Sequence, residues 1–176
     1  MKPLTLFVLA LGLSSAGCNE VLAPATPSGI VSLVSPLSGA QVVPAAGSLE
    51  AGAAGSLSVS MTPAGAGAYT ASFTFQVGGL VKAGLLPSPL DNGSVIVAGA
   101  VYQGAAGTAG APVLGLPISQ TVPIVTPTGS VLLTISNVQV SSAVASLILA
   151  NPSGFYFQLH SALNQAGVVR GQLIKQ

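Results

Sequence analysis

Charged side chains are scarce in this chain. Its 176 residues include four lysines or arginines and three aspartates or glutamates, which leaves a net charge of +1. Nucleic-acid binding relies on clustered lysine and arginine side chains that neutralise backbone phosphates. The composition therefore argues against a nucleic-acid partner, and it leaves little charged chemistry for any other site.

Cysteine, histidine and arginine occur once each, as Cys18, His160 and Arg170. A lone cysteine cannot form an internal disulfide. A transition-metal site usually takes three or four histidine, cysteine or carboxylate ligands. Beyond the N-terminal segment the candidate ligands are Cys18, Glu20, Glu50, Asp91 and His160. We therefore expect no metal site and no cofactor.

A catalytic constellation is equally hard to assemble from these residues. A serine–histidine–carboxylate triad would have to combine His160 with Asp91 or Glu50, and the chain has no nucleophile-elbow motif. The glycine-rich segment 103–110 is not followed by the Lys-Ser or Lys-Thr pair of a phosphate-binding loop. We therefore expect no catalytic residues and a chain that is not an enzyme.

Long uninterrupted apolar runs are missing after position 20. Hydrophobic residues make up 50% of the chain and the mean hydropathy is +0.78, but Gly, Pro, Ser, Thr or Asn breaks the runs every few positions. A membrane-spanning helix needs about 20 consecutive, mostly apolar residues. The 22 glycines and 13 prolines instead separate short segments, as is typical of an all-β protein.

The N-terminus has the pattern of an export signal. Lys2 precedes an apolar core over 3–13 and a small-residue zone over 14–17, directly before Cys18. The sequence Ser-Ala-Gly-Cys resembles the lipobox of bacterial lipoproteins, in which the cysteine is lipidated, although Ser15 stands where an aliphatic residue is usual. We predict a signal peptide over 1–17 and a lipidated Cys18 with a tether over 18–29; ordinary signal cleavage is the alternative.

This N-terminus predicts where the protein resides. We expect an exported protein of the bacterial cell envelope, anchored by lipid to a membrane and facing the periplasm or the cell surface. Its expected partners are the membrane, through the anchor, and an envelope protein or a second copy of the chain.

The rest of the chain, residues 30–176, is predicted to form one β domain. Leu57, Val59 and Met61 alternate with serines, and a second alternating run over 69–77 follows a turn, so the two runs predict a hairpin whose aromatic residues face the core. We expect an all-β Greek-key sandwich or barrel, dismutase-like or immunoglobulin-like, with at most one short helix. The expected strands are 30–37, 53–62, 69–77, 94–100, 113–118, 130–140, 155–161 and 168–174.

One helix is predicted, over residues 143–150. Ser141 and Ser142 offer an N-cap to an alanine- and leucine-rich segment, and the sequence Asn-Pro-Ser-Gly at 151–154 would stop it. The last two strands follow this helix.

The stretch 151–173 concentrates the rare polar side chains. Along the strand 155–161, a period of two places Tyr156, Gln158 and His160 on one face. If this strand pairs antiparallel with 168–174, Arg170 joins them in one polar patch. These four are the candidate binding residues; the alternative is that His160 and Arg170 are structural and bond to backbone carbonyls or a carboxylate.

Three motifs occur along the chain. They read LSGAQVVP at 37–44, GAAGTAGAPV at 104–113, and YFQLHS at 156–161 followed by NQAGVVRGQL at 164–173. In this order they resemble the motifs of CHRD domains, named for the animal protein chordin. The chain departs from the family where Ala100-Val101-Tyr102 replaces His-Ile-His, and where Val42 and Val168 replace glutamates.

The resemblance implies a non-enzymatic module with a binding or structural role, and the N-terminus adds the expected anchor in the envelope. Two alternatives remain. CHRD domains loosely resemble copper/zinc superoxide dismutases, so a degenerate redox enzyme of that class is one, with Arg170 steering an anion. A self-associating adhesion protein that pairs through exposed edge strands is the other.

Overall fold

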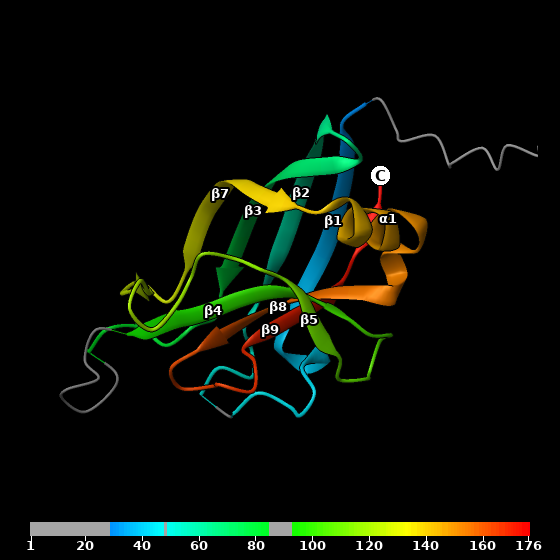
Figure 1. Ribbon diagram of the computed structural model, residues 1–176. Coiled ribbons are helices and arrows are strands. Elements are labelled where there is room, and N and C mark those ends of the chain that lie inside the picture. The colour runs from blue at the N-terminus through cyan, green and yellow to red at the C-terminus, as the bar shows by residue number, and fades with distance from the viewer. Residues whose placement is uncertain (1–28, 48, 85–92) are drawn as a thin grey trace, which may run out of the picture.

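The computed structural model describes residues 29–47, 49–84 and 93–176 (Figure 1). Within these residues the chain forms a nearly closed antiparallel β-barrel with one nine-residue α-helix, which confirms the predicted all-β class. The predicted signal peptide 1–17, the lipidated Cys18 and all but the last residue of the tether 18–29 lie outside the described residues, as does Asp91.

The strands follow one continuous hydrogen-bonded path, β5-β4-β8-β9-β1-β2-β3-β7, with β10 added beside β1 and β6 beside β4. Every pairing is antiparallel. The elements are β1 Val31–Ser38, η1 Gly39–Gln41, β2 Ala54–Gly65, β3 Ala68–Gly78, β4 Ser94–Gln103, β5 Ala111–Gly115, β6 Ile124–Thr126, β7 Val131–Val140, α1 Ser142–Ala150, η2 Pro152–Gly154, β8 Phe155–Ser161, β9 Val169–Gln172 and β10 Ile174–Lys175.

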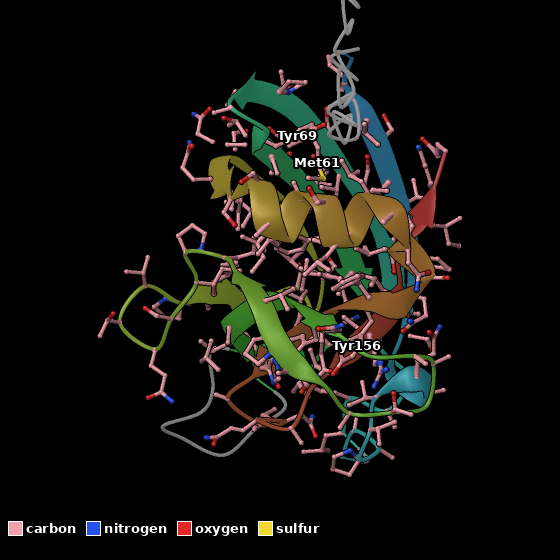
Figure 2. The ribbon with its side chains drawn as sticks, turned by 45° about the vertical axis from the view of Figure 1, so that its right-hand side comes forward. Met61, Tyr69 and Tyr156 are labelled. Atoms are coloured by element: carbon pink, nitrogen blue, oxygen red, sulfur yellow. The ribbon has the colours of Figure 1, made fainter. Side chains whose placement is uncertain are left out.

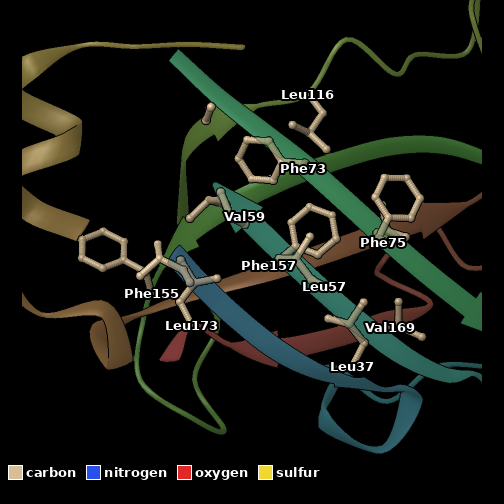
Figure 3. Packing of buried hydrophobic residues seen from close by; sticks show 14 of the residues in the cluster. Leu37, Leu57, Val59, Phe73, Phe75, Leu116, Phe155, Phe157, Val169 and Leu173 are labelled. Atoms are coloured by element: carbon tan, nitrogen blue, oxygen red, sulfur yellow. The ribbon is translucent and has the colours of Figure 1, made fainter. Parts of the chain in front are cut away.

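The predicted hairpin is β2–β3, and it supplies much of the core. Alternation buries Leu57, Val59 and Met61 of β2 while the intervening serines face outward. From β3, Phe73 and Phe75 pack against Phe157 of β8, with ring centroids 6.3 and 6.0 Å from that ring (Figure 3). The alternating aromatic side chains of 69–77 are therefore core residues, as predicted.

Helix α1 forms where the sequence predicted it and lies across the front of the barrel in Figure 2. The Ser141 hydroxyl caps it by accepting a hydrogen bond from the Val144 amide at 3.3 Å. Ala145 and Ile148 are its buried residues, and Ile148 lies beside Met61 of β2. Among the described residues, no helix has both the length and the apolar character needed to cross a membrane.

The C-terminal strand differs from the prediction. The expected strand 168–174 is divided into β9 and β10 by Leu173, which is buried and whose amide bonds to the Phe155 carbonyl. Beyond it the chain pairs with β1, with Ile174 opposite Val34. The strand expected at 113–118 lies at 111–115 because it follows its pairing with β4, after which Leu116 and Ile118 are buried. The short β6 was not predicted.

Candidate functional site

The candidate binding residues share one outward face of β8 and β9. Gln158 of β8 lies directly opposite Arg170 of β9, and Tyr156 lies opposite Gln172. Residues opposite each other in an antiparallel pair project to the same side. The same face continues onto β4, where Tyr102 lies opposite Tyr156. The structure thus brings the four predicted residues together and adds Tyr102, which had been noted only as a departure from the family pattern.

Arg170 is almost completely buried, with 1% of its surface exposed. Its Nη2 donates a hydrogen bond of 2.9 Å to the Ala105 carbonyl, and its guanidinium carbon lies 3.4 Å from the centroid of the Tyr156 ring. Burial lowers the pKa of Arg170, and the nearby Tyr156 partly opposes this shift. Arginine still carries its charge at neutral pH, so a cation is held within the domain.

Aromatic rings extend this contact across the sheet. The Tyr156 and Tyr102 rings stack with centroids 5.1 Å apart and planes 8° apart, and Tyr102 lies 5.9 Å from the His160 ring. Burial raises the pKa of Tyr102, and Tyr156 adds to that rise. The four side chains Arg170, Tyr156, Tyr102 and His160 form a continuous line, which we call the stacked row.

His160 is the solvent-facing end of the stacked row. Its Nδ1 lies 2.8 Å from the Gln165 carbonyl, which accepts only, so Nδ1 carries the proton. In the neutral ring Nε2 then accepts from the Tyr102 hydroxyl, 2.8 Å away. The tautomer of His160 is thus assigned from its two hydrogen-bond partners. His160 is half-buried and lines an open depression of about 230 Å³ with Ala98 and Gln120.

The glycine-rich loop 104–110 covers the other end of the stacked row. The Gly104 carbonyl accepts from Gln172 Nε2 at 3.0 Å, and the Ala105 carbonyl accepts from Arg170. The Gly110 amide donates to the Tyr156 hydroxyl at 3.0 Å. A phosphate-binding loop presents amide groups to its ligand, whereas this loop turns two carbonyl oxygens toward side-chain donors of the sheet.

Two buried polar atoms, one on Gln158 and one on Arg170, have no hydrogen-bond partner among the described residues. Gln158 is 4% exposed and donates through Nε2 to the Ala166 carbonyl at 2.7 Å. Its Oε1, like Nη1 of Arg170, finds no partner within the described part of the chain. Tyr156 is 3% exposed. Three of the four predicted binding residues are thus covered, and His160 alone reaches solvent.

A second polar cluster surrounds Glu50, which is completely buried. Its carboxylate accepts hydrogen bonds from Ser94, from Ser161 at 2.5 Å and from Asn164 Nδ2 at 2.6 Å. All three donors are neutral. Glu50 lies in the loop before β2, so its hydrogen bonds join that loop to β4 through Ser94 and to the loop after β8 through Asn164. The Asn164 side chain also accepts a hydrogen bond from the Gly47 amide of the same loop.

The sequence offers Glu50 as a possible metal ligand, a triad member or a partner of Arg170, and the structure instead surrounds it with Ser94, Ser161 and Asn164. One signal in the sequence could have indicated a structural role for Glu50: a carboxylate buried in an apolar domain needs hydrogen-bond donors around it. Ser161, which bonds to Glu50, and His160 project to opposite sides of β8 because neighbouring strand residues alternate. The structure therefore does not bring Glu50 and His160 into one triad.

No three His, Cys, Asp or Glu side chains gather into a metal-binding group within residues 29–47, 49–84 and 93–176. Cys18, Glu20 and Asp91 lie outside those residues. The expectation that the protein takes no metal or cofactor stays a prediction.

Comparison with protein-family models identifies a family. The model of the family described as the CHRD domain matches residues 33–173. The matched segment contains all three motifs on which the resemblance rests, and it includes the strands β4, β8 and β9 that carry the stacked row. No curated protein and no solved structure matches the chain.

Proposed function

The chain belongs to the CHRD domain family, and on this premise we propose that it is a non-enzymatic binding or structural module anchored to the bacterial cell envelope. The observation that carries the proposal is the burial of Arg170 and its hydrogen bond to the loop that covers it. A catalytic or anion-steering arginine needs an open path to its ligand, whereas Arg170 is 1% exposed and bonds to the loop that covers it. This supports a role in holding the loop 104–110 on the barrel.

The Glu50 cluster supports the same role at a second place. Glu50 holds the loop after β8 through Ser161 and Asn164. A buried carboxylate that is fully hydrogen-bonded by neutral donors fixes the groups around it, because losing a single donor leaves charge unsatisfied. Two internal polar centres therefore set the positions of the surface loops that a binding module presents.

Within this proposal His160 makes the contact with a ligand or partner protein. Tyr102 and Gln165 occupy both of its ring nitrogens and hold the ring at the edge of the open depression. Tyr156, Gln158 and Arg170 support it from the covered part of the face. His160→Ala is expected to affect ligand binding more than folding, whereas variants of Arg170 affect folding first.

The proposal is tested by metal analysis of the purified mature protein. The degenerate dismutase alternative requires bound copper or zinc at about one ion per chain, and we expect neither. Exposure to copper and zinc salts, followed by dialysis and elemental analysis, gives the measurement. Stoichiometric metal that survives dialysis would overturn the non-enzymatic proposal, and Glu50→Gln and His160→Ala would then show which side chain contributes to binding.

The anchoring part is tested by Cys18→Ser. If Cys18 is lipidated, wild-type protein partitions into detergent and sediments with membranes, whereas the variant is recovered in the soluble envelope fraction. Ser15→Leu, which restores the usual aliphatic residue of the lipobox, serves as the matched control and should remain membrane-bound. Equal membrane retention of Cys18→Ser and wild type would refute the lipid anchor without bearing on the domain's role.

A further inference from the structure

The outward face of β1, β2, β3 and β7 consists largely of hydroxyl side chains. In β2 the outward positions are Ser56, Ser58, Ser60 and Thr62, because the residues between them are buried or belong to the other face. Opposite them in β3 lie Gln76, Thr74, Ser72 and Thr70 in the same order. We call the outward side of these four strands the hydroxyl face.

The two flanking strands add apolar groups at its margins. On one side β1 places Ser32 opposite Ser60, Val34 opposite Ser58, and Pro36 opposite Ser56. On the other side β7 places Thr134 opposite Thr74 and Leu132 opposite Gln76. Leu132 is 70% exposed. Hydroxyls therefore occupy the middle of the face, with aliphatic side chains on both flanks.

Sheet geometry arranges these groups as a grid. Neighbouring strands lie about 4.8 Å apart, and successive outward residues of one strand lie about 6.7 Å apart. Three strand spacings therefore span roughly 14 Å. The Thr74 and Thr134 hydroxyls are 2.9 Å apart and bond to each other across β3 and β7.

Charge is absent from this grid, since its positions are serine, threonine, glutamine, valine, proline and leucine. The charged residues that the structure describes lie elsewhere. Glu50 and Arg170 are buried, Lys82 follows β3, and Lys175 lines a separate depression beside Ser32 at the end of the face. The electrostatic complement of such a surface is an uncharged polymer, because any fixed charge placed on it would lose hydration without gaining a partner.

A groove runs over this grid. It has a volume of about 360 Å³, and Val34, Pro36 and Leu132 contribute to its lining together with Ser58, Thr74 and Gln76. Gly55 also lines it and pairs with Val77.

We propose that the groove of the hydroxyl face binds a neutral polysaccharide chain. Serine and threonine hydroxyls both donate and accept hydrogen bonds, as sugar hydroxyls do, and the Gln76 amide adds two donors and an acceptor. The flanking aliphatic side chains match the C–H faces of sugar rings. The inference rests on the proposed function as a binding module and names a ligand class at a face separate from His160.

The test is co-sedimentation of the detergent-solubilised full chain with insoluble polysaccharides. The neutral probes are microcrystalline cellulose, chitin and starch granules, and cross-linked polygalacturonate is the anionic comparison. We expect the protein to sediment with at least one neutral probe and not with polygalacturonate. Binding should be the same in 0.05 and 0.5 M NaCl to within about twofold, because screening by salt does not weaken contacts between uncharged groups.

Ser58→Glu combined with Thr74→Glu places two charges in the groove and should weaken sedimentation at least tenfold. Ala143→Glu combined with Ser146→Glu is the matched control, because it adds two charges at exposed positions of α1, outside β1, β2, β3 and β7. Thermal melting of both variants verifies folding. If the double variant does not fold, Gln76→Ala with Leu132→Ala takes its place.

Three outcomes would overturn the inference. They are no sedimentation with any neutral probe, equal sedimentation of the groove variant and the α1 control variant, and a dimer by light scattering that the groove variant dissociates. The last outcome would assign the hydroxyl face to a second copy of the chain. None of them changes the metal or membrane-partition result, so failure of this inference is distinguishable from failure of the proposed function.

Discussion

The guanidinium carbon of Arg170 lies 3.4 Å from the centroid of the Tyr156 ring, and the two residues belong to adjacent strands. A cation–π contact gains strength when water is excluded from it. Arg170 and Tyr156 are 1% and 3% exposed, so this contact is dry. It joins β9 to β8 and, through the Ala105 carbonyl, joins both strands to the loop that covers them.

Arg170→Lys should therefore be destabilising although it conserves charge. An ammonium group lacks the flat surface that stacks on a ring and the fork of donors that reaches a carbonyl. We expect the free energy of unfolding to fall by about 2 kcal/mol, measured by urea denaturation. Tyr156→Phe is the control, because it keeps the ring and loses only the hydroxyl that accepts from the Gly110 amide.

A double-mutant cycle isolates the contact. Arg170→Lys and Tyr156→Leu should show a coupling energy of about 1 kcal/mol or more. A coupling energy near zero would mean that Arg170 acts only through its hydrogen bond to the loop.

Glu50→Gln tests whether the buried carboxylate is a structural centre. Ser94, Ser161 and Asn164 all donate to Glu50. An amide at this position turns one of the two acceptors into a donor that faces other donors. We expect Glu50→Gln to lower the free energy of unfolding by about 1 to 3 kcal/mol, measured by urea denaturation at neutral pH. Leu49→Ala, at a neighbouring position that is 64% exposed, should change stability by less than about 0.5 kcal/mol.

Local patterns in the sequence predicted the features that depend on local physics. A period of two identified the β2–β3 hairpin and the common face of Tyr156, Gln158 and His160. Ser141 identified the start of α1 because N-capping is a contact between near neighbours. These signals each lie within one turn or one strand of the chain.

Features set by distant pairings were not predictable in the same way. Tyr102 joins His160 because β4 pairs with β8, about 58 residues away along the chain, and no local pattern encodes that register. The burial of Arg170 depends on the loop 104–110 folding over β9. The role of Glu50 required Ser94 and Asn164, which come from two further segments. The four candidate binding residues are thus mostly covered, and their role as a binding patch stays a prediction.

Tyr102 predicts a dependence of stability on alkaline pH. Burial raises its pKa in the folded state above the ordinary value of 10.0. The folded state therefore holds the phenol proton of Tyr102 more tightly than the unfolded state does. The stability that this protonated side chain contributes is fully present below about pH 10, and it is lost as the pH rises from there through the higher folded-state pKa.

Tyr102→Phe should therefore flatten the decline of stability with pH. Urea midpoints measured between about pH 8 and pH 11 should fall less steeply for Tyr102→Phe than for wild type. At neutral pH the free energy of unfolding of Tyr102→Phe should be about 1 kcal/mol lower than that of wild type, because the hydrogen bond to His160 is removed. Parallel curves for the two proteins would contradict the assignment of the alkaline loss to Tyr102.

Gly171 of β9 packs tightly against β1. A Cβ at this position would overlap the Pro36 carbonyl oxygen and the Ser35 hydroxyl, and Gly171 itself is buried. The Pro36 carbonyl belongs to the β1 backbone, which cannot move away without disturbing the barrel. Gly171→Ala should therefore destabilise the domain by about 1 to 3 kcal/mol or more. Gly115→Ala in β5 is the matched control, because a Cβ there meets no atom within 4 Å. At Gly115 the lower entropy of the unfolded chain should leave stability unchanged or raise it by about 0.4 to 1 kcal/mol. Urea denaturation of both variants gives the comparison, and equal effects at the two glycines would show that the two strands are not held as closely as the structure places them.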